Sequence, residues 1–272
     1  MTDHAPPSEG LTTELLELAR EMAARAGALL RESRPDDLGV SATKSSPIDV
    51  VTEMDLASEK LITSMIAEAR PEDGVLGEEG AETSGSSGVR WVVDPLDGTV
   101  NYLYGLPSWA VSLAAEYHGE TVVAVVAVPS RGETFHAVRG GGAWRDGQPV
   151  HCRPSPPMDQ ALIGTGFGYQ QRRRQAQAGV VARLIPQVRD IRRAGAAAVD
   201  LCDVACGRLD GFYERGLQPW DLAAGDLIAR EAGALTGGRP GERPGGELTV
   251  AASPGVFERL QPLLEDWGAW HD

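Results

Sequence analysis

The sequence predicts an α/β fold made of two α/β layers that join near residues 151–157. Three observations support this prediction. Two long stretches before residue 71 repeat apolar residues at helical spacing, and residues 110–150 alternate short strands with turns. After Pro157, apolar strand-like segments alternate with helical ones. Repeats of about 3.6 and 2 residues are typical of half-buried helices and strands respectively.

The N-terminal half opens with helices. Residues 1–10 are polar and contain prolines, and we expect a disordered lead-in there. Apolar residues then recur at helical spacing over 11–33, which predicts an amphipathic helix. A second helix is predicted over 52–70 because Thr52 is followed three residues later by Asp55, the spacing of a capping box.

Strands follow these helices. The segment "RWVVD" at 90–94 predicts a buried strand, and 110–150 predicts an antiparallel meander. Three dipeptides favour its turns: His118-Gly119, Arg131-Gly132 and Asp146-Gly147. An N-terminal α+β half over 11–150 is therefore expected to carry the metal-binding motifs described below.

The C-terminal half, 151–272, is expected to alternate strands and helices and to complete the active site. Short apolar runs predict the strands, and amphipathic runs predict the helices. The strands are expected in 161–167, at the start of 191–207 and in 209–214, and the helices in 172–189, the rest of 191–207, 220–233 and from Ser253-Pro254 to about 267.

Composition excludes several classes of protein. The formal net charge is −14, whereas a nucleic-acid-binding surface needs a basic face. Apolar runs such as 121–129 are too short to span a bilayer, which takes about 20 residues. The polar N-terminus does not resemble a signal peptide. Three cysteines, Cys152, Cys202 and Cys206, cannot build a disulfide framework. We expect a cytoplasmic protein without nucleic-acid or membrane partners.

Four carboxylates stand at the edges of apolar segments: Glu78, Asp94, Asp97 and Asp221. A single such residue is usually a helix cap or a solvated loop residue, but four suggest a shared role. Carboxylate oxygens are ligands that Mg²⁺ prefers. In "DPLDGT" the fixed φ of Pro95 can bend the chain so that both aspartates converge on metal ions. Two metals can clamp the attacking and leaving oxygens of a phosphoryl transfer, so we predict direct attack by water on a phosphate ester.

Three motifs together resemble those of the inositol monophosphatase family. They are "GEE" at 77–79, "WVVDPLDGTVNY" at 91–102 and "WDLAAG" at 220–225, and the resemblance extends over about 11–265. It implies a layered αβαβα sandwich of the sugar-phosphatase type. It also implies a homodimer that hydrolyses phosphate monoesters with Mg²⁺ and is inhibited by Li⁺.

The resemblance assigns metal ligands by position. Glu78, Asp94 and the Leu96 carbonyl would bind a first Mg²⁺, while Asp94, Asp97 and Asp221 would bind a second. A third, weaker ion near Glu78 would make two to three ions per site. Thr99, paired with Asp55, would orient the attacking water, with Glu78 counted among the catalytic residues.

Further residues are expected around the substrate. Lys44 matches a mobile hairpin near the metals and could screen phosphate charge, although a surface lysine is the plainer alternative. Arg172–Arg174 could line the mouth of the site or simply face solvent. The resemblance implies that hydroxyl or phosphate groups of the substrate meet Gly98, Thr99, Gly195, Ala196, Ala197, Glu214 and Asp221.

The leading hypothesis is an inositol-1-phosphate phosphatase that releases myo-inositol and phosphate. Fructose-1,6-bisphosphatase, histidinol-phosphate phosphatase and 3′-phosphoadenosine 5′-phosphate phosphatase are alternatives on the same scaffold. A different alternative is a binding protein of transcription antitermination complexes, a role that some family members have. The intact set of carboxylates favours the enzyme.

Overall fold

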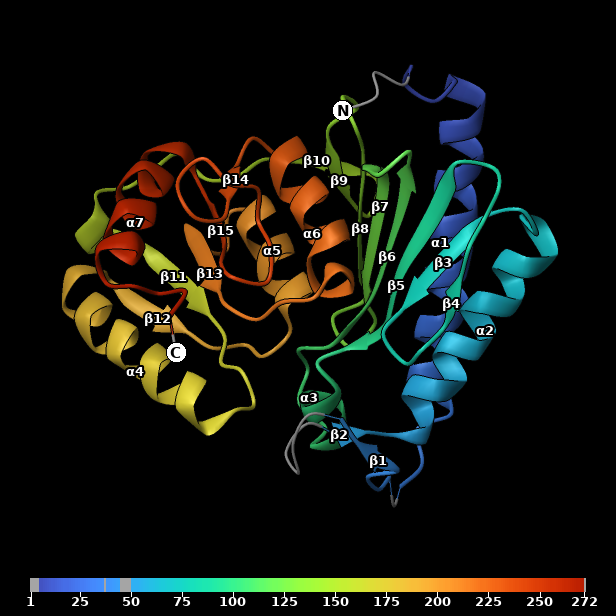
Figure 1. Ribbon diagram of the computed structural model, residues 1–272, viewed down its shortest axis with the longest axis horizontal. Helices are drawn as coiled ribbons and strands as arrows, with labels where there is room; N and C mark the ends of the chain where they lie inside the picture. Colours follow the sequence, from blue (N-terminus) through green and yellow to red (C-terminus); the bar gives the residue numbers. More distant parts are fainter. Residues whose placement is uncertain (1–4, 37, 45–49, 272) are drawn as a thin grey trace.

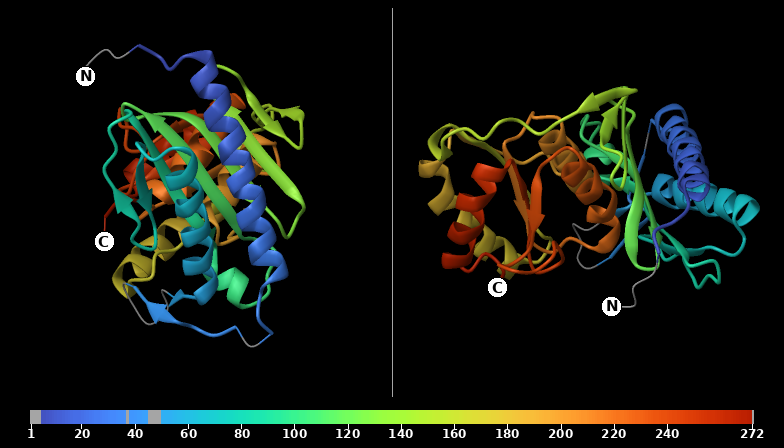
Figure 2. Two further views of the ribbon diagram at one scale, coloured as in Figure 1. Left: turned by 90° about the vertical axis from the view of Figure 1, so that its right-hand side faces the viewer. Right: turned by 90° about the horizontal axis from the view of Figure 1, so that it is seen from above.

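The computed structural model describes residues 5–36, 38–44 and 50–271. Helices and sheets alternate as helix, sheet, helix, sheet, helix, from right to left in Figure 1 and again when seen from above in Figure 2. The αβαβα sandwich predicted from the sequence is therefore confirmed. Within the described residues, no helix is long and apolar enough to cross a membrane.

Two helices cover the outer face of the first sheet (Figure 2). They are α1 (Glu9–Glu32) and α2 (Glu53–Ala69). The apolar stripe of α1 packs on the sheet, and Leu15, Met22 and Leu30 are fully buried. Ser8 caps α1 by accepting a hydrogen bond from the Leu11 N–H at 3.2 Å. Residues 9 and 10 are thus helical, which corrects the expected disorder there, while residues 1–4 lie outside the described residues.

The first sheet has eight strands in the order β10-β9-β8-β7-β6-β5-β3-β4. All neighbours are antiparallel except the parallel pair β3 and β5. The predicted meander accounts for five of the strands, and His118 and Asp146 adopt the positive φ that its tight turns require. The strands are β3 (Gly74–Gly77), β4 (Glu82–Thr83), β5 (Val89–Asp97), β6 (Ala110–Tyr117), β7 (Glu120–Val128), β8 (Glu133–Val138), β9 (Ala143–Arg145) and β10 (Gln148–Val150).

The second sheet has five strands in the order β12-β11-β13-β15-β14. Three of these strands lie in segments where the sequence predicts them, but β14, β15 and, in the first sheet, β3 and β4 were not predicted. Each of those four has at most four residues, too few to show a clear period. The strands are β11 (Leu162–Thr165), β12 (Asp190–Arg192), β13 (Gly211–Glu214), β14 (Leu235–Gly237) and β15 (Thr249–Ala252).

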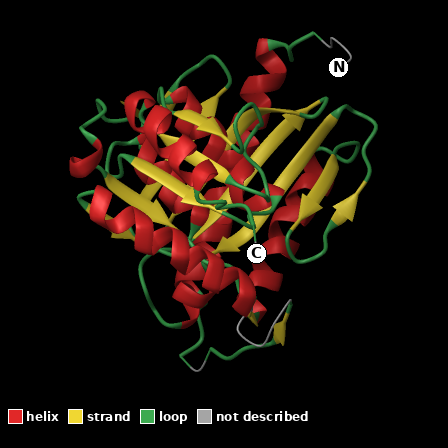
Figure 3. Cartoon of the chain, turned by 60° about the vertical axis from the view of Figure 1, so that its left-hand side comes forward, coloured by secondary structure: helices red, strands yellow, loops and turns green. Residues whose placement is uncertain are grey.

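Two helices, α5 (Ala197–Ala205) and α6 (Pro219–Glu231), lie between the sheets, as Figure 3 shows in red between two sets of yellow strands. Their small side chains pack on the inner face of the first sheet, where Ala198 and Leu227 are fully buried. Because α5 and α6 come from the C-terminal half, the two halves share this central core.

The remaining elements are peripheral. Helices α4 (Gln171–Leu184) and α7 (Pro254–Asp266) cover the outer face of the second sheet (Figure 1). The helix predicted over 172–189 ends at Leu184, because a short 3₁₀ turn with Pro186 (Ile185–Gln187) follows. Another 3₁₀ turn spans Met158–Gln160. A small hairpin pairs β1 (Ala42–Thr43) with β2 (Val50–Val51), and α3 (Thr99–Leu103) follows β5.

Candidate active site

An irregularity at the end of β5 brings two carboxylates to one side of the sheet. Asp94 pairs with Ser112 and Asp97 with Ala110, so three steps along β5 face two steps along β6. In a regular strand, residues three apart would point to opposite faces. The extra residue, next to Pro95, reverses that alternation. Asp94 and Asp97 consequently line the same cavity, with only 1% and 8% of their surface exposed. The predicted strand 90–94 thus continues to Asp97, bent as expected.

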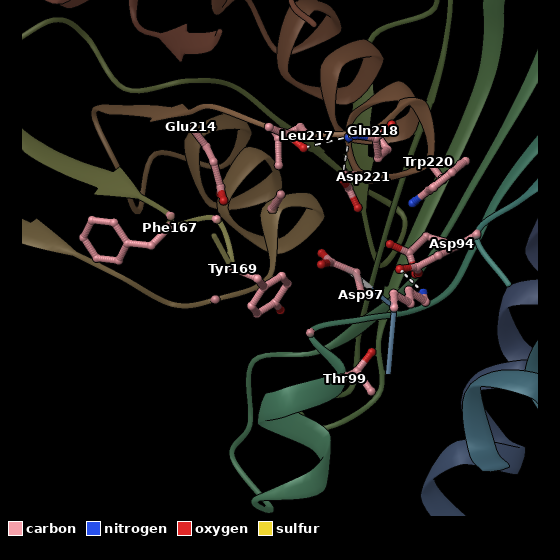
Figure 4. Close-up of a pocket in the computed structure, with 18 of the residues that line it drawn as sticks. Asp94, Asp97, Thr99, Phe167, Tyr169, Glu214, Leu217, Gln218, Trp220 and Asp221 are labelled. Atoms are coloured by element: carbon pink, nitrogen blue, oxygen red, sulfur yellow. Dashed lines mark hydrogen bonds and ion pairs between the residues drawn. The ribbon is translucent and has the colours of Figure 1, made fainter. Parts of the chain in front are cut away.

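Helix α6 supplies the third carboxylate from the other half of the chain. Asp221 lies in its first turn, directly after Pro219 and Trp220. The Gln218 backbone N–H donates a hydrogen bond of 2.6 Å to Asp221 Oδ2, which fixes the carboxylate as part of a capping box. Figure 4 shows Asp221, Asp94 and Asp97 directed toward the same space.

Glu78 follows strand β3 and is held against β5 through its own N–H, which donates to the Val93 carbonyl at 3.1 Å. Its carboxylate accepts a hydrogen bond of 2.7 Å from Lys44 Nζ, which also donates to Glu79 Oε1 at 2.7 Å. The buried Glu59 carboxylate in turn accepts the Glu79 N–H at 2.8 Å. Lys44 is thus part of the site, whereas the neighbouring residues 45–49 of the expected hairpin lie outside the described residues.

Thr99 and Asp55 form the expected pair. Thr99 Oγ1 lies 2.8 Å from Asp55 Oδ1 and 3.1 Å from the Leu96 carbonyl oxygen. The other oxygen of Asp55 accepts hydrogen bonds from the N–H of Thr52, at 2.8 Å, and from its hydroxyl. The predicted capping box of α2 therefore also orients Asp55 toward Thr99. Asp55 is fully buried behind Thr99 and does not itself line the cavity.

Gly98 connects this pair to the second half. Its φ is +88°, and a Cβ there would lie 2.8 Å from the Ser108 carbonyl oxygen, so only glycine fits. The preceding residue, Asp97, accepts a hydrogen bond of 2.8 Å from the Ala198 N–H at the start of α5. A backbone group of the C-terminal half thus positions a carboxylate of the N-terminal half.

Burial and mutual repulsion raise the pKa values of the clustered carboxylates. Burial, together with the nearby charges of Glu78, Asp97 and Asp221, raises the pKa of Asp94 well above its usual range. Burial and Glu78 also raise the pKa of Asp221 well above normal. For Asp97, burial raises the pKa to about 7, although the Ala198 N–H opposes that shift. Buried like charges need a compensating cation.

This donor set fits a hard divalent cation. It consists of carboxylate and carbonyl oxygens, which suit Mg²⁺ better than softer metals. Lys44 is the cation nearest to Glu78, and although burial lowers its pKa, the Glu78 carboxylate raises it above the ordinary value overall. Within the described residues, no three His, Cys, Asp or Glu side chains yet stand close enough together to hold an ion.

Most of the expected residues meet in one cavity of about 460 Å³, a size typical of small-molecule sites. Ala196 is an exception: it is 2% exposed and packs in the core beside α5 instead of lining the cavity. The residues that are both predicted and found in the lining are Lys44, Glu78, Asp94, Leu96, Asp97, Gly98, Thr99, Gly195, Ala197, Glu214 and Asp221.

The cavity also has lining residues that the sequence analysis did not identify. Tyr169 and Phe167 follow β11, and Figure 4 shows the Tyr169 ring directed toward the carboxylates. Arg193 and Arg215 line the cavity as well, and of Arg172–Arg174 only Arg173 does so. The position of Arg215 next to Glu214 in "FYERG" was the one signal that could have identified it.

Comparison with known proteins identifies the family. The model of the inositol monophosphatase family matches residues 11–266. The Inositol-1-monophosphatase SuhB of Mycobacterium tuberculosis (strain H37Rv) is 42% identical, over 92% of this chain and 93% of the relative. The Nus factor SuhB of Escherichia coli K12 is 38% identical, over 93% of this chain and 96% of the relative.

Solved structures agree. The extragenic suppressor protein suhB from Bartonella henselae superposes with a TM-score of 0.86 at 34% identity, covering 93% of this chain and 98% of that one. Mycobacterium tuberculosis SuhB gives a TM-score of 0.81 at 40% identity, covering 96% and 99%. The chain therefore belongs to the inositol monophosphatase family and is a phosphoric monoester hydrolase.

Proposed function

We propose that this enzyme hydrolyses inositol 1-phosphate to myo-inositol and phosphate in a Mg²⁺-dependent reaction. The observation that carries the proposal is the convergence of Glu78, Asp94, Asp97 and Asp221 on one cavity that the Thr99 hydroxyl also faces. Members of the family are generally metal-dependent, and the M. tuberculosis relative carries inositol-1-monophosphatase in its name.

The proposed ligands divide between two ions. Glu78, Asp94 and the Leu96 carbonyl would hold one, while Asp94, Asp97 and Asp221 would hold the other, and a third, weaker ion would bind near Glu78. When bound, Mg²⁺ would neutralise the charge of the phosphate and make a water molecule more acidic.

The chain's own groups orient the reaction. The Thr99 hydroxyl, held by Asp55, would position the water that attacks phosphorus. Asp55 would accept the proton of that water through the Thr99 hydroxyl. The N–H groups of Gly98 and Thr99 would donate to phosphate oxygens. One O–P bond forms to the water oxygen and the ester P–O bond breaks, so that the alcohol leaves with a proton. Asp221 would position the leaving oxygen.

The alcohol part would meet the C-terminal half. Glu214 points into the cavity (Figure 4) and can accept or donate hydrogen bonds to hydroxyl groups, while the backbone at Gly195 and Ala197 borders the same space. Lys44, which already contacts Glu78 and Glu79, would screen phosphate charge at the other side.

The test is phosphate release by metal-stripped protein, with and without added Mg²⁺. The panel contains inositol 1-phosphate, fructose 1,6-bisphosphate, histidinol phosphate and 3′-phosphoadenosine 5′-phosphate. A kcat/KM for inositol 1-phosphate at least about tenfold above the others, or about 1.4 kcal/mol in the transition state, supports the assignment. If another ester leads, the substrate assignment is wrong. Asp94→Asn and Asp221→Asn are expected to fold but to lose nearly all turnover.

A second candidate is a binding role in transcription antitermination. Its support is the E. coli relative, named Nus factor SuhB, and the net charge of −14, which suits a basic protein surface. Co-purification with RNA polymerase that persists in Asp94→Asn would support this role, and no co-purification would reject it.

We further propose that the protein is a homodimer in the cytoplasm. Analytical ultracentrifugation can test the dimer.

A further inference from the structure

Helix α2 places a further buried carboxylate behind the active site. Glu59 lies one helical turn after Asp55 and is only 7% exposed. It does not line the cavity, so it cannot meet the substrate directly. Burying a carboxylate is unfavourable unless hydrogen bonds or a nearby cation compensate for it. The partners of Glu59 therefore indicate its role.

The partners of Glu59 are backbone N–H groups of one turn. Its Oε2 accepts a hydrogen bond of 2.8 Å from the Glu79 N–H, and its Oε1 accepts one of 3.1 Å from the Ala81 N–H. The Gly77 N–H closes the same turn by donating to the Ala81 carbonyl at 2.6 Å. Both oxygens of Glu59 thus hold the turn formed by residues 77–81.

The turn rests directly on the Glu59 carboxylate. A Cβ at Gly77 would overlap Glu59 Oε2, and it would lie 2.9 Å from Glu59 Cδ and 3.1 Å from the Ala81 Cβ. Only a residue without a side chain allows this close approach. Any shift of the Glu59 carboxylate would therefore be felt by the backbone of the turn.

Glu78 lies within this turn and is fixed from both sides. Its own N–H donates to the Val93 carbonyl of β5 at 3.1 Å. The next peptide N–H, that of Glu79, is the one that Glu59 holds. One bond to the sheet and one to α2 thus set the direction in which the Glu78 side chain leaves the backbone toward the cavity.

We propose that Glu59 is a positioning residue that sets the Mg²⁺ affinity of the site through the turn that carries Glu78. This inference rests on the proposed Mg²⁺-dependent function and extends it to a residue outside the cavity. Groups that orient a metal ligand typically change metal affinity by about 10–100-fold when they are mutated. Glu78 is assigned to the first ion, so loss of Glu59 should weaken binding of that ion more than binding of the second.

The experiment is isothermal titration calorimetry of Mg²⁺ into metal-stripped protein. In Glu59→Gln, one acceptor oxygen becomes an NH₂ donor that faces a backbone N–H, so one bond to the turn is lost. The Kd for Mg²⁺ is expected to rise by roughly 10–100-fold, while kcat should recover at saturating Mg²⁺. Glu68→Gln, an exposed position on the same helix, is the matched control and should leave the Kd unchanged.

A double variant shows whether Glu59 acts through Glu78. Glu78→Gln is expected to weaken the same binding step, and Glu59→Gln/Glu78→Gln should bind Mg²⁺ no more weakly than Glu78→Gln alone. Losses that multiply in the double variant would overturn the proposal, and so would an unchanged Kd in Glu59→Gln. If Glu59→Gln does not fold, Gly77→Ala makes the same test by displacing the Glu59 carboxylate, and an unchanged Kd there overturns the proposal as well.

The outcomes separate this inference from the proposed function. If the wild type binds Mg²⁺ and hydrolyses inositol 1-phosphate while Glu59→Gln keeps its affinity, the positioning role is wrong and the phosphatase assignment stands. If the wild type releases no phosphate from any ester with Mg²⁺, the proposed function and the positioning role are overturned together.

Discussion

The Thr99 hydroxyl has two close acceptors, Asp55 Oδ1 and the Leu96 carbonyl. If its role is to orient water, the hydroxyl matters and the methyl group does not. We expect Thr99→Val to lower kcat by about 10²–10⁴-fold, the usual contribution of general acid–base catalysis, whereas Thr99→Ser should retain most activity. Steady-state phosphate release measures both. Equal losses in the two variants would contradict the role of the hydroxyl.

A single residue, Glu214, is also expected to make the stability of the folded protein depend on pH. Burial raises its pKa from 4.5 to about 8 in the folded protein. A raised carboxyl pKa means that the folded state holds its proton over that interval while the unfolded state does not, so stability falls as pH rises from 4.5 toward 8.

Glu214→Gln removes this titration. Without divalent cations, the melting temperature of the wild type is expected to fall relative to Glu214→Gln between about pH 4.5 and 8 and to level off above that interval. For a chain of this size, each kcal/mol corresponds to roughly 2–4 °C. Thermal unfolding followed by circular dichroism at matched ionic strength tests this. A constant difference across the series would refute it.

At the scale of elements, Asp73 joins α2 to the first sheet. It lies between them in the chain and is almost fully buried. Its carboxylate accepts hydrogen bonds from Arg70 Nε and from Trp91 Nε1 on β5, each at 2.9 Å, and from the Ser87 hydroxyl at 2.6 Å.

Asp73→Ala would leave the Trp91 N–H and the Arg70 charge without this partner. Breaking a buried ion pair in this way costs about 3–5 kcal/mol, and we expect a loss of that size in urea unfolding. Arg25→Ala, which removes an exposed ion pair with Glu21, is the control and should cost less than about 0.5 kcal/mol. If both variants unfold at the same urea concentration, Asp73 has no such role.

The scale of elements also shows what the sequence can predict. Glu78, Asp94, Asp97 and Asp221 were identified because each stands in a short motif whose local backbone sets its direction. Ala196 was expected to contact substrate through its backbone, and the structure shows only that its methyl group packs in the core and does not line the cavity. Arg173 could not be separated from Arg172 and Arg174, since their orientation depends on how α4 packs on the second sheet.

The order of the helical and sheet layers could not be predicted from the residue patterns alone. Periodicity predicted most of the helices and strands, but the short strands β3, β4, β14 and β15 have too few residues for a clear pattern. That α5 and α6 would lie between the sheets, instead of outside them, came from the resemblance to the family. Their small residues, such as Ala198 and Ala224, fit a helix that is packed on both sides. Small residues alone do not show which elements pack against these helices.

For the whole molecule, the central prediction concerns Mg²⁺. Ions that bind only the folded state should stabilise it by about 2.7 kcal/mol at a concentration a hundredfold above Kd, or roughly 5–10 °C in melting temperature. Differential scanning calorimetry with and without Mg²⁺ measures this. The double variant Asp94→Asn/Asp97→Asn should show no shift. A shift of equal size in that variant would place the bound ions elsewhere.

The hydrogen bond between Asp97 and the Ala198 N–H has a consequence for biosynthesis. The two residues are 101 positions apart, and a ribosome adds about 5–20 residues per second. Asp97 therefore waits roughly 5–20 s for its partner, and Asp221 is made later still. From residue 150 onward the nascent chain contains every strand of the first sheet, but its active site still lacks α5 and Asp221. Catalysis thus begins only when nearly the whole chain has been translated, and the enzyme cannot act on its substrate while it is still being made.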